Sequence, residues 1–231
     1  MRQKPSCHAQ IPLTYLPTTY LRHVTDDTSW HQMIHNLFHS CLSEILAPLQ
    51  RAGVEGILMK DGGGVLWHCH AILACYVRDY PEQVLVTGTK TKDCPKCNMP
   101  ADQLGSLTKP CELRDHQAIL DMLALVDSDP RSFRETCKNL HIKPIFCPFF
   151  VHLPYTDIFQ AITPDILHQL HQGVLKHLLS WLVQAYGASE INARVQHLIP
   201  NHHIQIFSSG ITNLSVTIGQ CYRYHHTSRL M

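Results

Sequence analysis

The sequence has no net charge of consequence and no long apolar run. Its 19 lysines and arginines are balanced by 18 aspartates and glutamates, so the formal charge is only +1. Charge alone therefore gives no reason to expect a polyanionic partner. No uninterrupted apolar segment approaches the roughly 20 residues that a helix needs to cross a bilayer. We therefore expect a soluble protein without a membrane partner.

A secretory signal is also missing, and this bears on the ten cysteines. The first five residues carry two basic side chains and no apolar segment follows them directly. We therefore expect reduced thiols in an intracellular protein and no disulfide framework. Internal repeats and low-complexity tracts are absent as well. With 231 residues, of which 45% are apolar, the chain is long enough to bury a core.

Helical periodicity is present in several segments. Apolar residues recur at three- and four-residue spacing over about 29–51, where Ser29 can cap the helix. The strongest pattern begins at Thr163-Pro164-Asp165, with Thr163 expected as the cap and Pro164 at the first helical position. Gly187 is expected to end it. Shorter helices are predicted over about 115–126, 131–140 and 188–198.

Short β-type runs lie between these helices. Gly56–Lys60 and Val65–His68 flank Asp61 and three glycines, which predicts a hairpin with Asp61 as a turn residue. The apolar run Ala71–Val77 suits a buried strand or a buried helix. Val84–Thr87 is a further strand candidate. Together with the helices, these runs predict a mixed α/β fold.

Cys94 and Cys97 enclose two residues and could hold one zinc ion from a single tight turn. The same spacing is a redox motif when it opens a helix, but Pro100 disfavours a helix there. Inert thiols are the third interpretation. His168 and His171, three apart on one helical face, are the most economical further zinc ligands. Cys111 and His116 are alternatives, and both helical histidines can equally be packing or capping residues.

Two acidic residues stand at informative places. Asp79 ends the apolar run and precedes Tyr80-Pro81, and an acid at the carboxyl end of a strand lies where metal-binding residues collect in α/β sheets. A strand-ending turn residue is the simpler interpretation of Asp79 taken alone. Asp165 likewise has a simpler interpretation as a helix-start residue. Neither acid carries a functional claim by itself.

Four segments taken together resemble a known family. They are Ile72–Gln83, Cys94–Cys97, Leu153–Phe159 and Thr163–Val174. Their combination closely resembles fungal Plavaka-type DNA transposases, relatives of the CACTA and Kyakuja-Dileera-Zisupton groups. The similarity covers roughly residues 4–215.

The resemblance implies a ribonuclease H-like core with a largely helical insertion. Three carboxylates of such a core hold two divalent ions, normally Mg²⁺, for cleavage and transfer of DNA strands in the nucleus. In the family, the second carboxylate closes a core strand and precedes a Cys-x-x-Cys pair, which matches Asp79, Cys94 and Cys97. A later Asp-x-x-His matches Asp165 and His168. DNA, and not a small molecule, is the implied substrate, and intact transposase is a further partner.

The departures from the family pattern concern the other two carboxylates. No equivalent of the first precedes Asp26, and the pattern breaks after Ser215, before the expected final Glu. We therefore expect an incomplete core over residues 1–91, a zinc-type loop and helical insertion over 92–215, and a divergent tail over 216–231. The expected function is that of a degenerate, inactive fragment of a transposase catalytic domain. Alternatives are a catalytically dead, zinc-stabilised module that binds DNA or protein, and a reading frame without a stable product.

Overall fold

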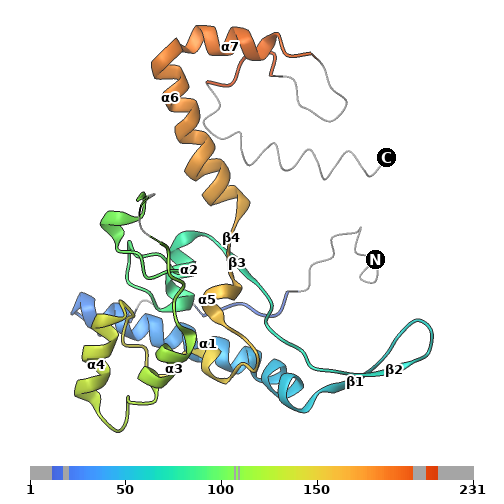
Figure 1. Cartoon of the computed structure of the whole chain (residues 1–231), viewed down its shortest axis with the longest axis vertical. Helices are drawn as coiled ribbons and strands as arrows, with labels where there is room; N and C mark the ends of the chain where they lie inside the picture. Colours follow the sequence, from blue (N-terminus) through green and yellow to red (C-terminus); the bar gives the residue numbers. More distant parts are fainter. Residues whose placement is uncertain (1–11, 18–20, 107, 109, 200–206, 213–231) are drawn as a thin grey trace. The chain divides into compact units, whose positions relative to one another are not determined.

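The structure is a computed structural model that describes residues 12–17, 21–106, 108, 110–199 and 207–212. Two compact units make up the chain. The first unit comprises Met1–Tyr76 and Pro81–Thr163, and the second comprises Val77–Tyr80 and Pro164–Met231. Figure 1 labels the elements along the chain. No helix in the described ranges is both long enough and apolar enough to cross a membrane.

A single long helix, α1 (Asp27–Glu55), confirms the first predicted helix. It begins two residues before Ser29, because the Asp26 carboxylate accepts a hydrogen bond from the Ser29 N–H and so takes the capping role. The helix ends at Gly56, whose φ of +74° is a conformation that glycine adopts without strain. The Gly56 N–H bonds to the carbonyl of Ala52, which closes the last turn.

The predicted hairpin is confirmed. Strands β1 (Ile57–Lys60) and β2 (Leu66–Cys69) pair antiparallel, with Ile57 opposite Cys69 and Lys60 opposite Leu66. Asp61 holds the turn, because its carboxylate accepts hydrogen bonds from the N–H groups of Gly63 and Val65 and from the indole of Trp67. In Figure 1 the hairpin extends away from the helices of the first unit.

The next segment corrects a strand prediction. Val84–Thr87 belongs to helix α2 (Tyr80–Thr87), and within the run Ala71–Val77 a strand, β3 (Tyr76–Arg78), forms only at the end. Pro81 and Glu82 favour a first helical turn, and the helix buries Gln83, Val84, Val86 and Thr87. Burial on one helical face has therefore outweighed the β propensity of this valine-rich run.

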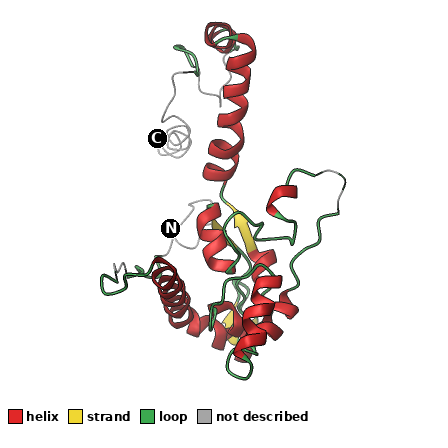
Figure 2. Ribbon diagram, turned by 90° about the vertical axis from the view of Figure 1, so that its left-hand side faces the viewer, coloured by secondary structure: helices red, strands yellow, loops and turns green. Residues whose placement is uncertain are grey.

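The core of the first unit lies where α1 meets several short helices. These are α3 (His116–Leu123), α4 (Pro130–Asn139), η3 (Phe149–His152) and α5 (Ile158–Ala161), whereas the short η2 (Ala101–Gln103) buries no residue. Figure 2 draws the helices in red and the few short strands in yellow. Helices α3 and α4 confirm two predicted helices and are capped by Asp115 and Asp129. The largest fully buried side chains are Phe149, Phe150, Phe159, Met122, Ile145, Ile158 and Ile162.

The second unit contains most of the strongest predicted helix. Strand β4 (Ile162–Pro164) pairs with β3, and η4 (Ile166–Leu175), a π-helix, continues into α6 (Lys176–Tyr186). The predicted cap is corrected, because Thr163 lies in β4 and Asp165 is the capping residue. Gly187 ends α6 as expected, and α7 (Ala188–Gln196) confirms the last predicted helix.

The fold is thus a mixture of helices and small sheets, as predicted. Among the described residues, the strands form two separate two-stranded sheets, β1-β2 and β3-β4. These sheets do not show the ribonuclease H-like core that the resemblance implies. The predicted domain ranges 1–91 and 92–215 remain predictions, and the tail 216–231 lies outside the described residues.

Candidate functional site

The cysteine turn, residues 94–97, is held by backbone hydrogen bonds to the segment 112–114. Cys97 forms an isolated antiparallel bridge with Leu113, and the Arg114 N–H donates to the Lys96 carbonyl at 2.9 Å. The Lys96 N–H points to the Cys94 sulfur at 3.4 Å. Residues 98–100 carry no regular secondary structure, so no helix opens directly after the pair. Both thiols are free. This context differs from the helix-opening context of a redox motif.

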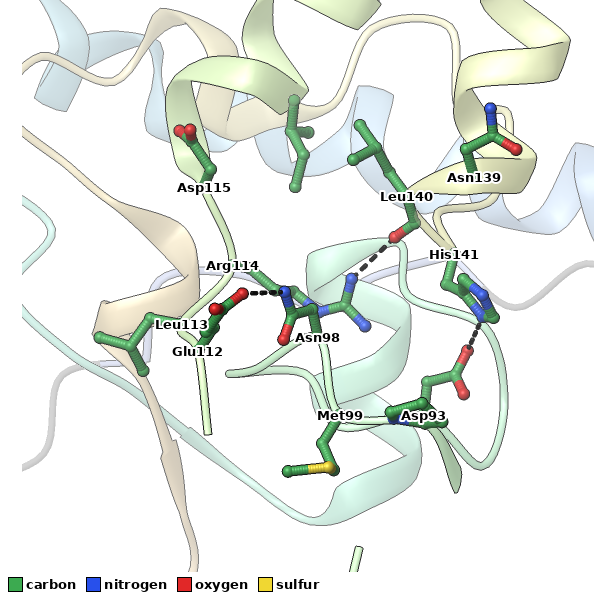
Figure 3. A pocket seen from close by; sticks show the side chains of 12 residues that line it. Asp93, Asn98, Met99, Glu112, Leu113, Arg114, Asp115, Asn139, Leu140 and His141 are labelled. Carbon is green, nitrogen blue, oxygen red and sulfur yellow. Dashed lines mark hydrogen bonds and ion pairs between the residues drawn. The ribbon is translucent and has the colours of Figure 1, made fainter. Parts of the chain in front are cut away.

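Arg114 is the residue that fixes the cysteine turn to the rest of the first unit. Its side chain is buried, its Nε donates to the Cys94 carbonyl at 2.9 Å, and its Nη1 donates to the Leu140 carbonyl at 2.9 Å (Figure 3). Burial lowers the pKa of the guanidinium, while Asp93, Cys94 and Cys97 act in the opposite direction. An arginine remains charged after such a shift.

The pKa of the Cys94 thiol is raised, which favours the neutral form. Burial raises its pKa, the backbone N–H groups of Lys96 and Cys97 lower it, and the neighbouring Cys97 thiol raises it again. Backbone N–H groups that point to sulfur would stabilise a thiolate. The turn therefore offers two sulfur donors and local hydrogen bonds that favour a thiolate, although the metal-free Cys94 thiol stays protonated at neutral pH.

A pocket of about 400 Å³ lies beside the cysteine turn. Asp93 pairs with the His141 ring at 3.1 Å, and the Asn98 amide donates to Glu112 at 3.2 Å (Figure 3). These pairs tie the pocket wall together across segments that are far apart in the sequence. Much of the pocket's polar lining is therefore engaged in holding the fold around the cysteine turn.

Asp79 and Asp165 follow two strands that end side by side. Asp79 comes directly after β3, Asp165 comes directly after β4, and the Asp165 N–H donates to the Arg78 carbonyl at 3.2 Å. This hydrogen bond joins the carboxyl ends of both strands. Two acids that are 86 positions apart in the sequence are thereby brought to the same edge of one small sheet, the edge where α/β proteins gather metal-binding groups.

Asp165 is also bound to His168. Its carboxylate accepts hydrogen bonds from the His168 backbone N–H at 2.6 Å and from the ring Nδ1 at 2.7 Å. Desolvation raises the pKa of Asp165. The hydrogen bonds and the charge of His168 together lower this pKa by a larger amount, so the net shift is downward. The interpretation of Asp165 as a helix-start residue is thus confirmed, and the structure makes it the cap in place of Thr163. His168 is exposed and His171 is half-buried on the same helix.

The alternative zinc ligands differ in their surroundings. His116 packs against Phe150 and Phe159, and its Nδ1 lies 3.9 Å from Asp157, as is typical of a core histidine. Cys111 is exposed. The cysteine turn belongs to the first unit, whereas His168 and His171 belong to the second. In the part of the chain that the structure describes, no group of three or more His, Cys, Asp or Glu side chains could hold a metal ion.

Sequence reasoning did not find Arg114 or the contact between the ends of β3 and β4. An arginine three residues after an exposed cysteine carries no local signal, since its partners are the carbonyls of Cys94 and Leu140. The approach of Arg78 to Asp165 depends on strand pairing between segments that periodicity cannot connect.

The family assignment now rests on a comparison with protein-family models. The model described as Plavaka transposase matches residues 1–182, which is most of the chain. The chain belongs to the Plavaka transposase family. Searches of curated proteins and of solved structures gave no match. The match includes Asp79, Cys94, Cys97, Asp165, His168 and His171, so all six candidate residues lie in the shared region.

Proposed function

We propose that this member of the Plavaka transposase family derives from the DNA-cleaving part of a transposase and does not cleave DNA by itself. The observation that carries the proposal is the position of Asp79, inside the family match and at the carboxyl end of β3. In this proposal Asp79 is an acid that held a divalent ion in the ancestral enzyme. DNA is the partner, with intact transposase as a second one, and the nucleus is the site of action.

The arrangement at the ends of β3 and β4 supports this assignment. Asp165, which the family pattern also includes, lies beside the end of β3 through its hydrogen bond to Arg78. Two-metal phosphoryl transfer requires several oxygen ligands around ions that are about 4 Å apart. Asp165 already caps η4 and binds His168, so its carboxylate is committed to the helix start. We therefore assign no Mg²⁺-dependent step to the described residues.

The cysteine turn favours a second candidate function, a zinc-stabilised module that binds DNA or protein. Two thiols on one turn, a backbone N–H directed at sulfur and anchoring by Arg114 fit a structural zinc ion. A structural zinc ion supplies folding free energy and no chemistry of its own. Cys94 and Cys97 would hold it, and the assignment of His168 and His171 as the remaining ligands stays a prediction.

The zinc content of the purified chain tests this module directly. We expect one zinc ion at the cysteine turn of each chain, and we expect this ion to be lost together with a cooperative melt in the Cys94→Ser, Cys97→Ser double variant. A Cys75→Ser variant is the matched control, because Cys75 is exposed and bonds Thr163 instead of lying in the turn. A chain that melts cooperatively without zinc would rule out the metal-dependent module.

A cleavage assay tests the loss of catalysis separately. The chain is incubated with duplex DNA and Mg²⁺ or Mn²⁺, beside an Asp79→Asn variant, and the products are resolved on a denaturing gel. We expect equal background for both proteins. Cleavage that disappears in Asp79→Asn would show that the chain is an active enzyme. Retention of a specific DNA sequence by the zinc-loaded chain, without cleavage, would support the binding module.

A further inference from the structure

Cys147 and His152 form a pair of potential metal ligands that the proposed transposase chemistry does not use. The Cys147 sulfur lies 3.7 Å from the His152 Nε2, and both side chains are exposed. Neither residue belongs to the cysteine turn or to the strand ends that carry Asp79 and Asp165. Among the described residues, neither side chain has a second hydrogen-bond partner, and because both side chains are exposed an ion can reach both donor atoms.

The short helix η3, which begins two residues after Cys147 and ends at His152, fixes the separation of the two residues. Pro148 precedes η3, and Phe149 and Phe150 within η3 are almost completely buried. The Phe149 ring also stacks on His39 at 5.6 Å between centroids. Because the buried rings of Phe149 and Phe150 hold η3 in the core, Cys147 just before the helix and His152 at its end are presented from a rigid base. Little conformational entropy would be lost when an ion binds both.

The distance between the two donor atoms suits a tetrahedral ion. Zinc bonds of about 2.3 Å to sulfur and about 2.0–2.1 Å to nitrogen, at a tetrahedral angle, place the two donors about 3.6 Å apart. The observed 3.7 Å is close to this value, so little rearrangement is needed. Thiolate and imidazole together select borderline-soft ions such as Zn²⁺ over Mg²⁺ or Ca²⁺.

We propose that Cys147 and His152 form a bidentate surface site for a borderline-soft divalent cation of the Zn²⁺ class. The thiol loses its proton to solvent when the metal–sulfur bond forms, and the imidazole binds through Nε2. The two remaining positions of a tetrahedral ion are taken by water. The site is independent of the cysteine turn and of the proposed loss of catalysis.

Zinc protection of individual thiols tests the site in the full chain. The protein is alkylated with N-ethylmaleimide over a series of Zn²⁺ concentrations, and the rate at each cysteine is read by peptide mass spectrometry. We expect Zn²⁺ to slow alkylation of Cys147, because a metal-bound thiolate is a poorer nucleophile than a free one. Cys75, which is exposed but bonds a threonine hydroxyl, is the internal control and is expected to react at an unchanged rate.

Variants of His152 separate bidentate binding from a zinc–thiol contact alone. In His152→Ala the Zn²⁺ concentration needed to protect Cys147 should rise about tenfold or more. The ion then loses its second protein ligand, whose binding is intramolecular once the first contact has formed. His152→Cys keeps a ligating side chain and should retain protection. The exposed position makes both changes compatible with the fold, which circular dichroism checks. Equal protection of Cys147 in wild type and His152→Ala, or no protection in either, would overturn the proposal.

Discussion

The core around η3 and the helical segment η4–α6 share a helical pattern of apolar residues but differ in burial. Phe149, Phe150 and Phe159 of the first unit are almost completely buried, whereas no side chain of η4 or α6 is buried. Trp181 in α6 is 63% exposed. Periodicity therefore predicts that a helix forms, but burial requires a second surface against which the apolar face packs.

This difference implies that stability is unequal along the chain. Most of the buried apolar side chains belong to the first unit, so most of the free energy of apolar burial arises there. The segment η4–α6 depends instead on its cap, its backbone hydrogen bonds and its helix propensity. We expect η4–α6 to open locally without unfolding the core.

Removal of a core aromatic side chain should have the largest effect. Phe149→Ala leaves a cavity between α1 and η3 and removes the ring that stacks on His39, so unfolding should become easier by about 3–5 kcal/mol. Trp181→Ala should change the free energy of unfolding by less than about 0.5 kcal/mol. Urea denaturation followed by circular dichroism measures both. A similar loss for the two variants would mean that α6 is part of the same packed core.

Acidification should weaken the first unit selectively. His39 is fully buried and its Nε2 bonds the Leu85 carbonyl at 3.0 Å. Burial lowers its pKa to about 4, against 6.5 in the unfolded chain. The unfolded state therefore binds the proton first, so the stability from neutral His39 is complete above about pH 6.5 and is lost as the pH falls towards 4.

The pH effect should reach about 3 kcal/mol, from about 1.4 kcal/mol for each unit of the pKa difference. His35, whose pKa is also lowered to about 4 by burial and then by Lys143 and His31, adds a smaller effect because it is more exposed. Urea midpoints measured from pH 7.5 to 4.5 test this, with His39→Phe as the control that removes the titrating group. An unchanged slope in His39→Phe would contradict the role assigned to His39.

Glycine substitutions sharpen the comparison further. Gly88 and Gly187 have φ of +70° and +83°, so an added Cβ costs about 1–2 kcal/mol in backbone strain at either position. At Gly88 the new Cβ would also lie 2.8 Å from the Ile145 Cδ1, whereas nothing lies within 4 Å of it at Gly187. Gly88→Ala should therefore be the more destabilising by about 1 kcal/mol in thermal melts. Equal losses would show that Ile145 moves aside without cost.

The sequence predicted the elements better than it predicted their contacts. The helices at α1, α3, α4 and α7 and the hairpin at Asp61 follow from local patterns, so their predictions are confirmed. The strand predicted at Val84–Thr87 was wrong, because burial of one helical face outweighed the β propensity of these residues. The prediction of Thr163 as the cap was wrong, because β4 pairs with β3 and keeps the backbone extended up to Pro164. The helix therefore begins after Asp165, which takes the capping role.

The candidate site shows the same division. The spacing of Cys94 and Cys97 is local, and the structure supplies a turn with an N–H directed at sulfur. Arg114, which fixes that turn, bonds carbonyls 20 and 26 positions away in the sequence, and the ends of β3 and β4 are further apart still. Long-range hydrogen bonds have no periodic signature in a single sequence. The sequence therefore predicted the motifs but not the contacts that hold them.

The smallest expected effect comes from the two helix caps. Asp129 accepts a hydrogen bond from the Ser132 N–H at the start of α4, and Asp165 accepts one from the His168 N–H at the start of η4. Each Asp→Ala change removes about 1 kcal/mol from its own helix. Because α4 carries the buried Phe133 and Cys137, loss of the Asp129 cap should lower the melting temperature of the whole first unit.

Loss of the Asp165 cap should instead increase hydrogen exchange over residues 166–175, with little change in the melting temperature of the first unit. Asp165→Asn, which keeps the acceptor oxygen, should largely restore protection from exchange. A fall in the melting temperature of Asp165→Ala as large as that of Asp129→Ala would show that η4–α6 and the core unfold as one cooperative unit.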